Sequence, residues 1–140
     1  MSVIILHGFT GDGSTMRALA DLADPAAIVP DLVGHGAGPH STDPADYTVD
    51  AMADAVLALA GDRCDLVGYS MGGRVALTAA CRHPERVRSL TLIGASAGLA
   101  DADERRARAS ADDELAELVE RDLPAFVDGW MANPLFASQT

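Results

Sequence analysis

The stretch Asp65-Leu-Val-Gly-Tyr-Ser70-Met-Gly-Gly-Arg74 decides how the rest of this chain folds. A short apolar run leads into Gly68, and helical spacing begins at Met71, so Ser70 lies at the turn between a strand and a helix. Glycines two residues before and after the serine permit a tight turn that exposes its hydroxyl at the helix N-terminus. The pattern predicts that Ser70 is a nucleophile; the alternative is a serine with only a structural role.

The segments on either side of this turn alternate between strands and helices. Short apolar runs predict strands at 3–6, 27–31, 65–69 and 87–93, and helical periodicity predicts helices at 16–22, 48–59 and 71–82. Strands separated by helices pair in parallel through right-handed crossovers. We therefore expect an α/β fold, a parallel sheet with helices on both faces and the strand order 27–31, 3–6, 65–69, 87–93.

The pattern changes after Gly98, where helices follow one another without strands. Asp101 and Glu104 have the spacing of a capping box, and helical periodicity follows over 104–119 and 123–130. We expect residues 1–98 to form the N-terminal part of the core. Residues 99–140 are expected to begin a helical cap.

Three motifs together resemble the α/β-hydrolase superfamily over residues 3–94: His7-Gly-Phe-Thr-Gly, Asp31-Leu-Val-Gly-His-Gly and Val67-Gly-Tyr-Ser-Met-Gly-Gly-Arg. The resemblance implies a partial α/β-hydrolase fold. In this fold, the loop after the first of these strands and the residue after the nucleophile supply backbone N–H groups to an oxyanion hole. The corresponding residues are Phe9 and Met71. His7 and His35 are interpreted as structural rather than catalytic.

A narrower resemblance extends into the second half of the chain. It rests on Ser70-Met-Gly-Gly-Arg-Val-Ala-Leu, Gly98-Leu, Glu104-Arg, Arg108, Phe126-Val-Asp, Trp130 and the stretch from Asn133 to Gln139. These residues are similar to those of 2-succinyl-6-hydroxy-2,4-cyclohexadiene-1-carboxylate synthase, the menaquinone-pathway lyase that eliminates pyruvate from its substrate. The resemblance implies a small-molecule polycarboxylate as substrate and no cofactor or metal.

Arginine is well suited to such a substrate because its planar guanidinium pairs with carboxylates in a bidentate manner. Arg74 lies one helical turn after Ser70 and is predicted to bind a substrate carboxylate, and the resemblance implies the same role for Arg108. The alternative for Arg108 is a solvated helix face with Glu104 at i−4. Tyr69 and Trp130 match aromatic positions near the family's pocket, although Trp130 is equally well explained by packing.

The α/β-hydrolase order of catalytic residues is Ser, then Asp, then His. No such pair is recognisable after Ser70, and His40 and His83 are poor replacements for the base. We therefore expect the chain to be truncated at its C-terminus and to be inactive as given. Two alternatives remain: a general ester, thioester or carbon–carbon hydrolase, and a non-catalytic fragment or binding protein.

Composition excludes several other classes of function. The net charge is −11 and every basic residue is arginine, so a nucleic-acid partner is not expected. We recognise no signal peptide and expect no membrane-spanning run, and Cys64 and Cys81 lack metal-ligand spacing. These features predict a cytoplasmic protein with free thiols; they do not indicate an oligomeric state.

Overall fold

The computed structural model describes residues 2–136, so the last part of the stretch from Asn133 to Gln139 lies outside the described residues. The chain divides into two compact units, one up to Ala97 and the other from Gly98 onward. Each unit is described by itself below. The division falls beside Gly98, where the sequence pattern changes.

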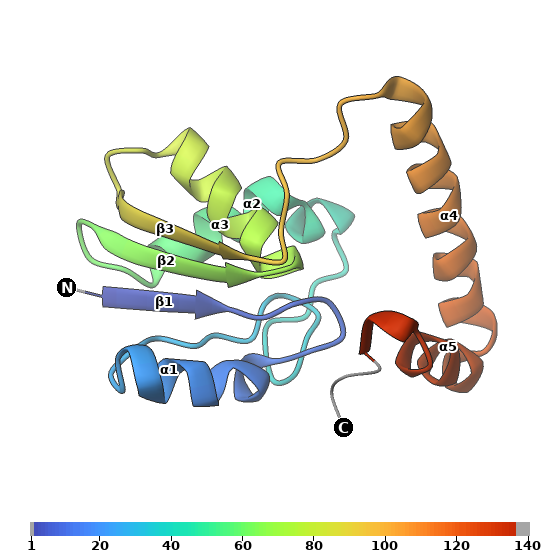
Figure 1. Ribbon diagram of the computed structural model, residues 1–140, viewed down its shortest axis with the longest axis horizontal. Helices are drawn as coiled ribbons and strands as arrows, with labels where there is room; N and C mark the ends of the chain where they lie inside the picture. Colours follow the sequence, from blue (N-terminus) through green and yellow to red (C-terminus); the bar gives the residue numbers. More distant parts are fainter. Residues whose placement is uncertain (1, 137–140) are drawn as a thin grey trace. The chain divides into compact units, whose positions relative to one another are not determined.

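The first unit contains a three-stranded parallel sheet (Figure 1). Its strands are β1 (Ser2–Leu6), β2 (Cys64–Tyr69) and β3 (Val87–Ile93), in the spatial order β1-β2-β3. Ile4 pairs with Leu66, and Leu66 pairs with Leu90. The prediction of a parallel sheet in this order is confirmed for these three strands.

The prediction of a strand over 27–31 is wrong. This segment makes a single parallel bridge, in which Ile28 lies beside Ile4 on the edge of β1 away from β2. The Ile28 N–H donates to the Val3 carbonyl at 2.8 Å, and the Ile28 carbonyl accepts from the Ile5 N–H at 2.9 Å. Pro30 has no N–H to continue a ladder, so the pairing stops after one bridge although the segment lies where the fold predicts it.

Helices cover both faces of the sheet. The helices α2 (Val49–Ala58) and α3 (Met71–Arg82) lie on one face, and α1 (Arg17–Ala23) lies on the other (Figure 1). A 3-10 helix, Gly13–Met16, precedes α1, and another, Pro44–Tyr47, precedes α2. The expected α/β architecture with helices on both faces is therefore present.

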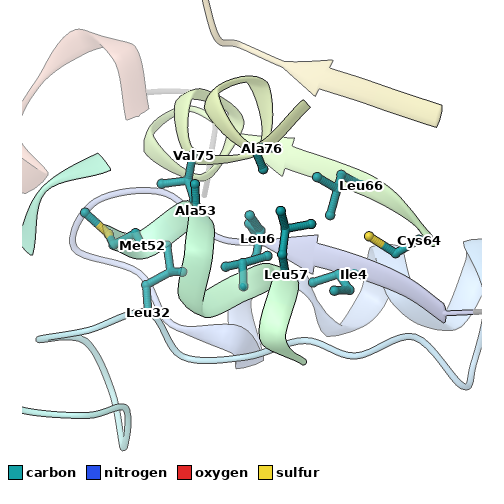
Figure 2. Close-up of a cluster of buried hydrophobic side chains, with 12 residues drawn as sticks. Ile4, Leu6, Leu32, Met52, Ala53, Leu57, Cys64, Leu66, Val75 and Ala76 are labelled. Atoms are coloured by element: carbon teal, nitrogen blue, oxygen red, sulfur yellow. The ribbon is translucent and has the colours of Figure 1, made fainter. Parts of the chain in front are cut away.

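Alternation along the strands divides the core in two, because successive strand side chains point to opposite faces. Ile5 packs with Met16 and Ala20 beside α1. The cluster on the α2 and α3 side is fully or nearly fully buried (Figure 2) and includes Ile4, Leu6, Leu32, Met52, Ala53, Leu57, Cys64, Leu66, Val75 and Ala76. This packing fixes the carboxyl ends of β1 and β2 against α3.

The second unit is helical. It contains α4 (Ala102–Arg121), α5 (Leu123–Met131) and a 3-10 turn, Pro134–Phe136. The carboxylate of Asp101 accepts hydrogen bonds from the N–H groups of Asp103 and Glu104, so it caps α4 as the capping-box spacing predicts. Among the helices of residues 2–136, none is long and apolar enough to cross a membrane.

Candidate functional site

Ser70 occupies a strained turn between β2 and α3. Its backbone has φ 51° and ψ −111°, a conformation that side-chain-bearing residues rarely adopt and that costs about 1–3 kcal/mol. The Ser70 N–H donates to the Ile93 carbonyl at the end of β3, at 2.9 Å. Such strain persists only where the surrounding structure enforces it, and it is common at functional sites.

The glycines of the motif are required by close backbone contacts. A Cβ atom at Gly68 would lie 2.5 Å from the Gly73 Cα, and one at Gly72 would lie 2.5 Å from the His7 carbonyl oxygen. The end of β2, the start of α3 and the end of β1 therefore meet with no room for a methyl group. This close contact explains why the serine is flanked by glycines on both sides.

The first turn of α3 provides N–H groups that have no acceptor four residues earlier in the helix. Of these, the Gly72 N–H donates outside the helix, to the His7 carbonyl at 3.0 Å, and the regular helical hydrogen bonds begin with the Arg74 N–H, which donates to the Ser70 carbonyl at 3.2 Å. Met71, the predicted oxyanion-hole donor, lies in this same turn immediately after Ser70. The helix dipole there favours developing negative charge.

The loop after β1 lies against the serine turn. A Cβ atom at Gly8 would lie 3.4 Å from the Ser70 Cβ and 3.0 Å from the Tyr69 ring. Phe9, the second predicted oxyanion-hole residue, follows Gly8 directly in this loop. The Phe9 ring is 47% exposed and meets the His35 ring edge-on, with 5.9 Å between centroids.

His7 is fully buried and has a structural environment. Its Nε2 accepts a hydrogen bond from the Leu32 N–H at 3.0 Å, and its Nδ1 lies 2.8 Å from the Gly8 carbonyl oxygen. A ring that accepts at Nε2 and donates from Nδ1 is the neutral Nδ1–H tautomer. Both nitrogens are occupied, so His7 has no free nitrogen for proton transfer.

The other histidines do not complete a catalytic pair with Ser70. His35 Nδ1 lies 3.0 Å from the Val33 carbonyl oxygen, and His83 Nε2 lies 3.1 Å from an oxygen of Asp54. His83 follows the last residue of α3, about 20 Å along the helix from Ser70 at 1.5 Å per residue. Within residues 2–136, no histidine is hydrogen-bonded to the Ser70 hydroxyl.

Tyr69 precedes Ser70 at the end of β2 and faces the α1 side of the sheet. It packs against the buried cluster that contains Ile5 and Met16. Its ring fills the space above Gly8 and also lies 3.6 Å from where a Cβ atom of Gly94 would stand. The ring therefore shapes the backbone around Ser70 from two directions.

Arg74 is exposed on the first full turn of α3. Other arginines of this unit are engaged: Arg82 pairs with Asp54 at 3.3 Å, and Arg88 pairs with Asp65. Within the described part of the chain, the Arg74 guanidinium makes no ion pair or side-chain hydrogen bond. It is a cation held one turn from Ser70 without an internal carboxylate partner.

Arg108 and Trp130 lie in the second unit. Arg108 donates to Asp112 at 2.8 Å, so its carboxylate neighbour is at i+4 rather than Glu104 at i−4. Trp130 stacks on Phe126 with 5.8 Å between centroids and lies 6.0 Å from the Phe136 ring. Trp130 thus belongs to an aromatic cluster within this unit.

Two features were missed by sequence reasoning. The carboxylate of Asp31 accepts backbone hydrogen bonds from Gly13 and Ala37, which join two loops near Ser70. A cavity of about 420 Å³ lies between α2 and the loop after Pro30, and its lining includes neither Ser70 nor Phe9. The sequence signals for the first feature were the position of Asp31 at the end of an apolar run and its place at the start of the Asp31-Leu-Val-Gly-His-Gly motif.

Comparison with known proteins agrees with this geometry. The sequence profile of the family described as "alpha/beta hydrolase fold" matches residues 2–138. The putative 2-succinyl-6-hydroxy-2,4-cyclohexadiene-1-carboxylate synthase of Bacillus subtilis (strain 168) is 39% identical over 99% of this chain and 53% of its own length. The synthase of the same name from Klebsiella pneumoniae (strain 342) is 39% identical over 97% of this chain and 55% of its own length.

Solved structures give the same relationship. The structure of MenH from S. aureus has a TM-score of 0.80 and 30% identity, covering 99% of this chain and 55% of that one. A thermophilic esterase from Thermogutta terrifontis, with malate bound, has a TM-score of 0.71 and 32% identity, covering 94% and 48%. The chain spans about half the length of the curated relatives it matches. With a match over residues 2–138, a parallel α/β sheet and a strained Gly-x-Ser-x-Gly turn, this chain belongs to the α/β-hydrolase fold family.

Proposed function

We propose that this chain is part of a 2-succinyl-6-hydroxy-2,4-cyclohexadiene-1-carboxylate synthase, which eliminates pyruvate from 2-succinyl-5-enolpyruvyl-6-hydroxy-3-cyclohexene-1-carboxylate. The observation that carries the proposal is the position of Arg74, which lies one turn from a strained Ser70 and has no carboxylate partner among residues 2–136. An enzyme that only hydrolyses neutral esters gains nothing from such a cation. Relatives with this name match 97–99% of the chain, which supports the same conclusion.

In the proposed reaction, Ser70 acts with an Asp–His pair and takes a proton from the substrate ring. The electron pair of that C–H bond forms a new ring double bond, the existing ring double bond shifts by one position, and the carbon–oxygen bond to the enolpyruvyl group breaks. The enolate that leaves takes up a proton on its methylene carbon and becomes pyruvate. The backbone N–H groups of Phe9 and Met71 would stabilise the enolate-like charge that develops, as preorganised donors do in other oxyanion holes. No acyl-enzyme and no cofactor are required.

Recognition of the substrate would come from two arginines. A charge-assisted hydrogen bond contributes about 1.5–3 kcal/mol, and an arginine fork also fixes the orientation of a carboxylate. Arg74 would bind one carboxylate close to Ser70, and Arg108 would bind another. Tyr69 and Trp130 would line the pocket.

The test uses the full-length enzyme with two substrates, the polycarboxylate and a neutral ester such as p-nitrophenyl acetate. Arg74→Ala is expected to lower kcat/KM for the polycarboxylate by about 10- to 100-fold and to leave neutral-ester turnover within about twofold. Ser70→Ala is expected to abolish both activities. The matched control is Arg63→Ala, because Arg63 precedes β2 and lies at the opposite end of the strand from Ser70.

The main rival is a general hydrolase, and the similarity to the thermophilic esterase favours it. If Arg74→Ala changes both substrates equally or changes neither, the rival replaces the synthase. If Ser70→Ala has no effect on either reaction, both enzyme proposals fail and a non-catalytic role remains.

The 140-residue chain alone is proposed to be inactive. Within residues 2–136, Ser70 has no histidine bonded to its hydroxyl, and a serine without a base is a weak nucleophile. Pyruvate release by the purified 140-residue chain, at a rate near that of the full-length enzyme, would contradict this proposal.

A further inference from the structure

The loop from His7 to Gly13 carries Phe9 within a turn, in which the Gly11 N–H donates to the Gly8 carbonyl at 3.1 Å. It has no regular secondary structure until the 3-10 helix begins at Gly13. A backbone donor contributes to an oxyanion hole only if it is held in place before the reaction. The groups that fix both ends of this loop therefore influence whether Phe9 can act.

The C-terminal end of the loop is held by the Asp31 carboxylate. Its Oδ1 accepts from the Gly13 N–H at 2.6 Å, and its Oδ2 accepts from the Ala37 N–H at 2.8 Å. One carboxylate thus joins the loop after β1 to the loop after Pro30. These contacts cross 18 and 6 residues of sequence respectively.

The carboxylate lies in a recess that two glycines keep open. A Cβ atom at Gly13 would lie 2.6 Å from the Val29 carbonyl oxygen and 3.1 Å from Asp31 Oδ1. A Cβ atom at Gly36 would lie 2.7 Å from Asp31 Cγ. A larger residue at either glycine would displace the carboxylate. The two glycines are therefore needed for Asp31 to occupy this position.

The N-terminal end of the loop is held by the neighbouring residue. The Leu32 N–H donates to His7 Nε2 at 3.0 Å, and the His7 ring is fully buried. Asp31 and Leu32, adjacent in sequence, therefore hold the two ends of the seven-residue loop from His7 to Gly13.

We propose that Asp31 is a positioning residue that holds the loop from His7 to Gly13 so that the Phe9 N–H faces the Ser70 reaction centre. The inference rests on the oxyanion-hole role given to Phe9 in the proposed function. Asp31 does not touch the substrate; it acts through Gly13 and the loop.

The ionisation of Asp31 agrees with this role. The N–H groups of Gly13 and then Ala37 hold the pKa of Asp31 below its ordinary value, while partial burial opposes them. His35 acts in the same direction as the N–H groups, and the nearby carboxylate of Asp12 repels Asp31. The carboxylate is therefore the form that holds the loop near neutral pH.

The first test needs no variant and no substrate. In amide NMR spectra recorded between pH 2 and pH 7, the Gly13 and Ala37 signals should shift together with one midpoint below that of an ordinary aspartate. If the Gly13 and Ala37 signals titrate with different midpoints, one Asp31 carboxylate does not hold both loops and the proposal is overturned.

The second test is kinetic and uses the full-length enzyme with the polycarboxylate and a neutral ester. Asp31→Asn keeps one acceptor oxygen and turns its NH₂ group toward the other backbone N–H, so kcat should fall about 10- to 100-fold for both substrates with KM within about twofold. The kcat of Asp31→Ala should fall further than that of Asp31→Asn, and the kcat of Asp24→Asn should equal that of the wild type. Unchanged kcat in Asp31→Asn would overturn the role.

The two substrates separate this proposal from the proposed function. If the wild type releases no pyruvate but Asp31→Asn still slows ester turnover, the synthase assignment fails and the positioning role stands. If Asp31→Asn does not fold, the wild-type titration of the Gly13 and Ala37 signals still tests whether the Asp31 carboxylate holds both loops.

Discussion

The backbone N–H of Gly72 donates a 3.0 Å hydrogen bond to the backbone carbonyl of His7. This bond joins α3, the helix that follows Ser70, to the end of β1. Gly72 follows Met71 directly, and His7 lies two residues before Phe9, so a single bond connects the segments that carry both proposed oxyanion donors. The distance between these segments therefore cannot change without breaking a buried backbone contact.

Gly72→Ala is expected to destabilise the protein by about 3 kcal/mol or more. The new Cβ would lie 2.5 Å from the His7 oxygen and 2.7 Å from the Leu6 carbonyl carbon, and neither is the end of a flexible side chain. Urea unfolding followed by circular dichroism measures the change. Gly129→Ala is the control: nothing lies within 4 Å of its Cβ, and alanine is favoured over glycine inside a helix by about 1 kcal/mol. Equal stability of the two variants would contradict the close contact at Gly72.

The strain at Ser70 predicts a separation of stability from activity. Ser70→Gly relieves the positive φ, whereas Ser70→Ala keeps the strain and removes only the hydroxyl. Ser70→Gly should therefore be more stable than Ser70→Ala by about 1 kcal/mol, although both lack the nucleophile. Chemical unfolding of the two variants under identical conditions makes the comparison. A less stable Ser70→Gly would mean that the turn is not strained.

The sequence predicted the parts of the fold that depend on local pattern. Helix α3 and strand β3 have the predicted bounds, because the glycine spacing around Ser70 and the His83-Pro84 stop act locally. The prediction of a strand at 27–31 was wrong because Pro30 has no N–H to continue the hydrogen-bond ladder, although the segment is apolar. Apolar periodicity detects burial, but it does not show whether a ladder of hydrogen bonds can form.

Only those residues of the candidate site that belong to a recognisable sequence motif could be predicted from the sequence. The positions of Ser70 and Met71 follow from the Gly-x-Ser-x-Gly turn. The role of Asp31 was not predictable, because its partners are backbone N–H groups that carry no residue-type signal. The partner of Arg108 was also undecided by spacing, since Glu104 at i−4 and Asp112 at i+4 lie on the same helix face.

Asp65 predicts an acid-dependent part of the stability. Its carboxylate accepts from Arg88 Nε at 2.7 Å and from the Ser89 hydroxyl at 2.6 Å, and it also pairs with Arg88 through a second guanidinium nitrogen. The hydrogen bond from Arg88 is the main cause of a pKa below the ordinary 3.8, helped by Ser89 and opposed by burial.

A lowered pKa in the folded state gives stability that is fully present above the ordinary pKa and is lost as the pH falls through the folded value. Asp65→Asn should cost about 1–2 kcal/mol at pH 7, since Arg88 is half exposed and regains water. The difference from the wild type should shrink below about pH 4. Unfolding free energies at several pH values measure it; a difference independent of pH would contradict the ion pair.

The ion pair between Asp112 and Arg108 is expected to affect how tightly Arg108 binds a substrate carboxylate. Arg108 and Asp112 pair at 2.8 Å with both side chains about half exposed, and an exposed ion pair contributes about 0.2–1 kcal/mol. If Arg108 binds a substrate carboxylate, Asp112 competes with the substrate for the same guanidinium. In the full-length enzyme, Asp112→Asn should therefore lower KM for the polycarboxylate by about 1.4- to 5-fold with little change in kcat.

Asp103→Asn is the control, because it breaks the pair with Arg106 on the same helix without touching Arg108. The neutral ester should show no change in either variant. If Asp112→Asn and Asp103→Asn shift KM equally, the effect is a general change in the charge of α4 and Arg108 has no special role in binding.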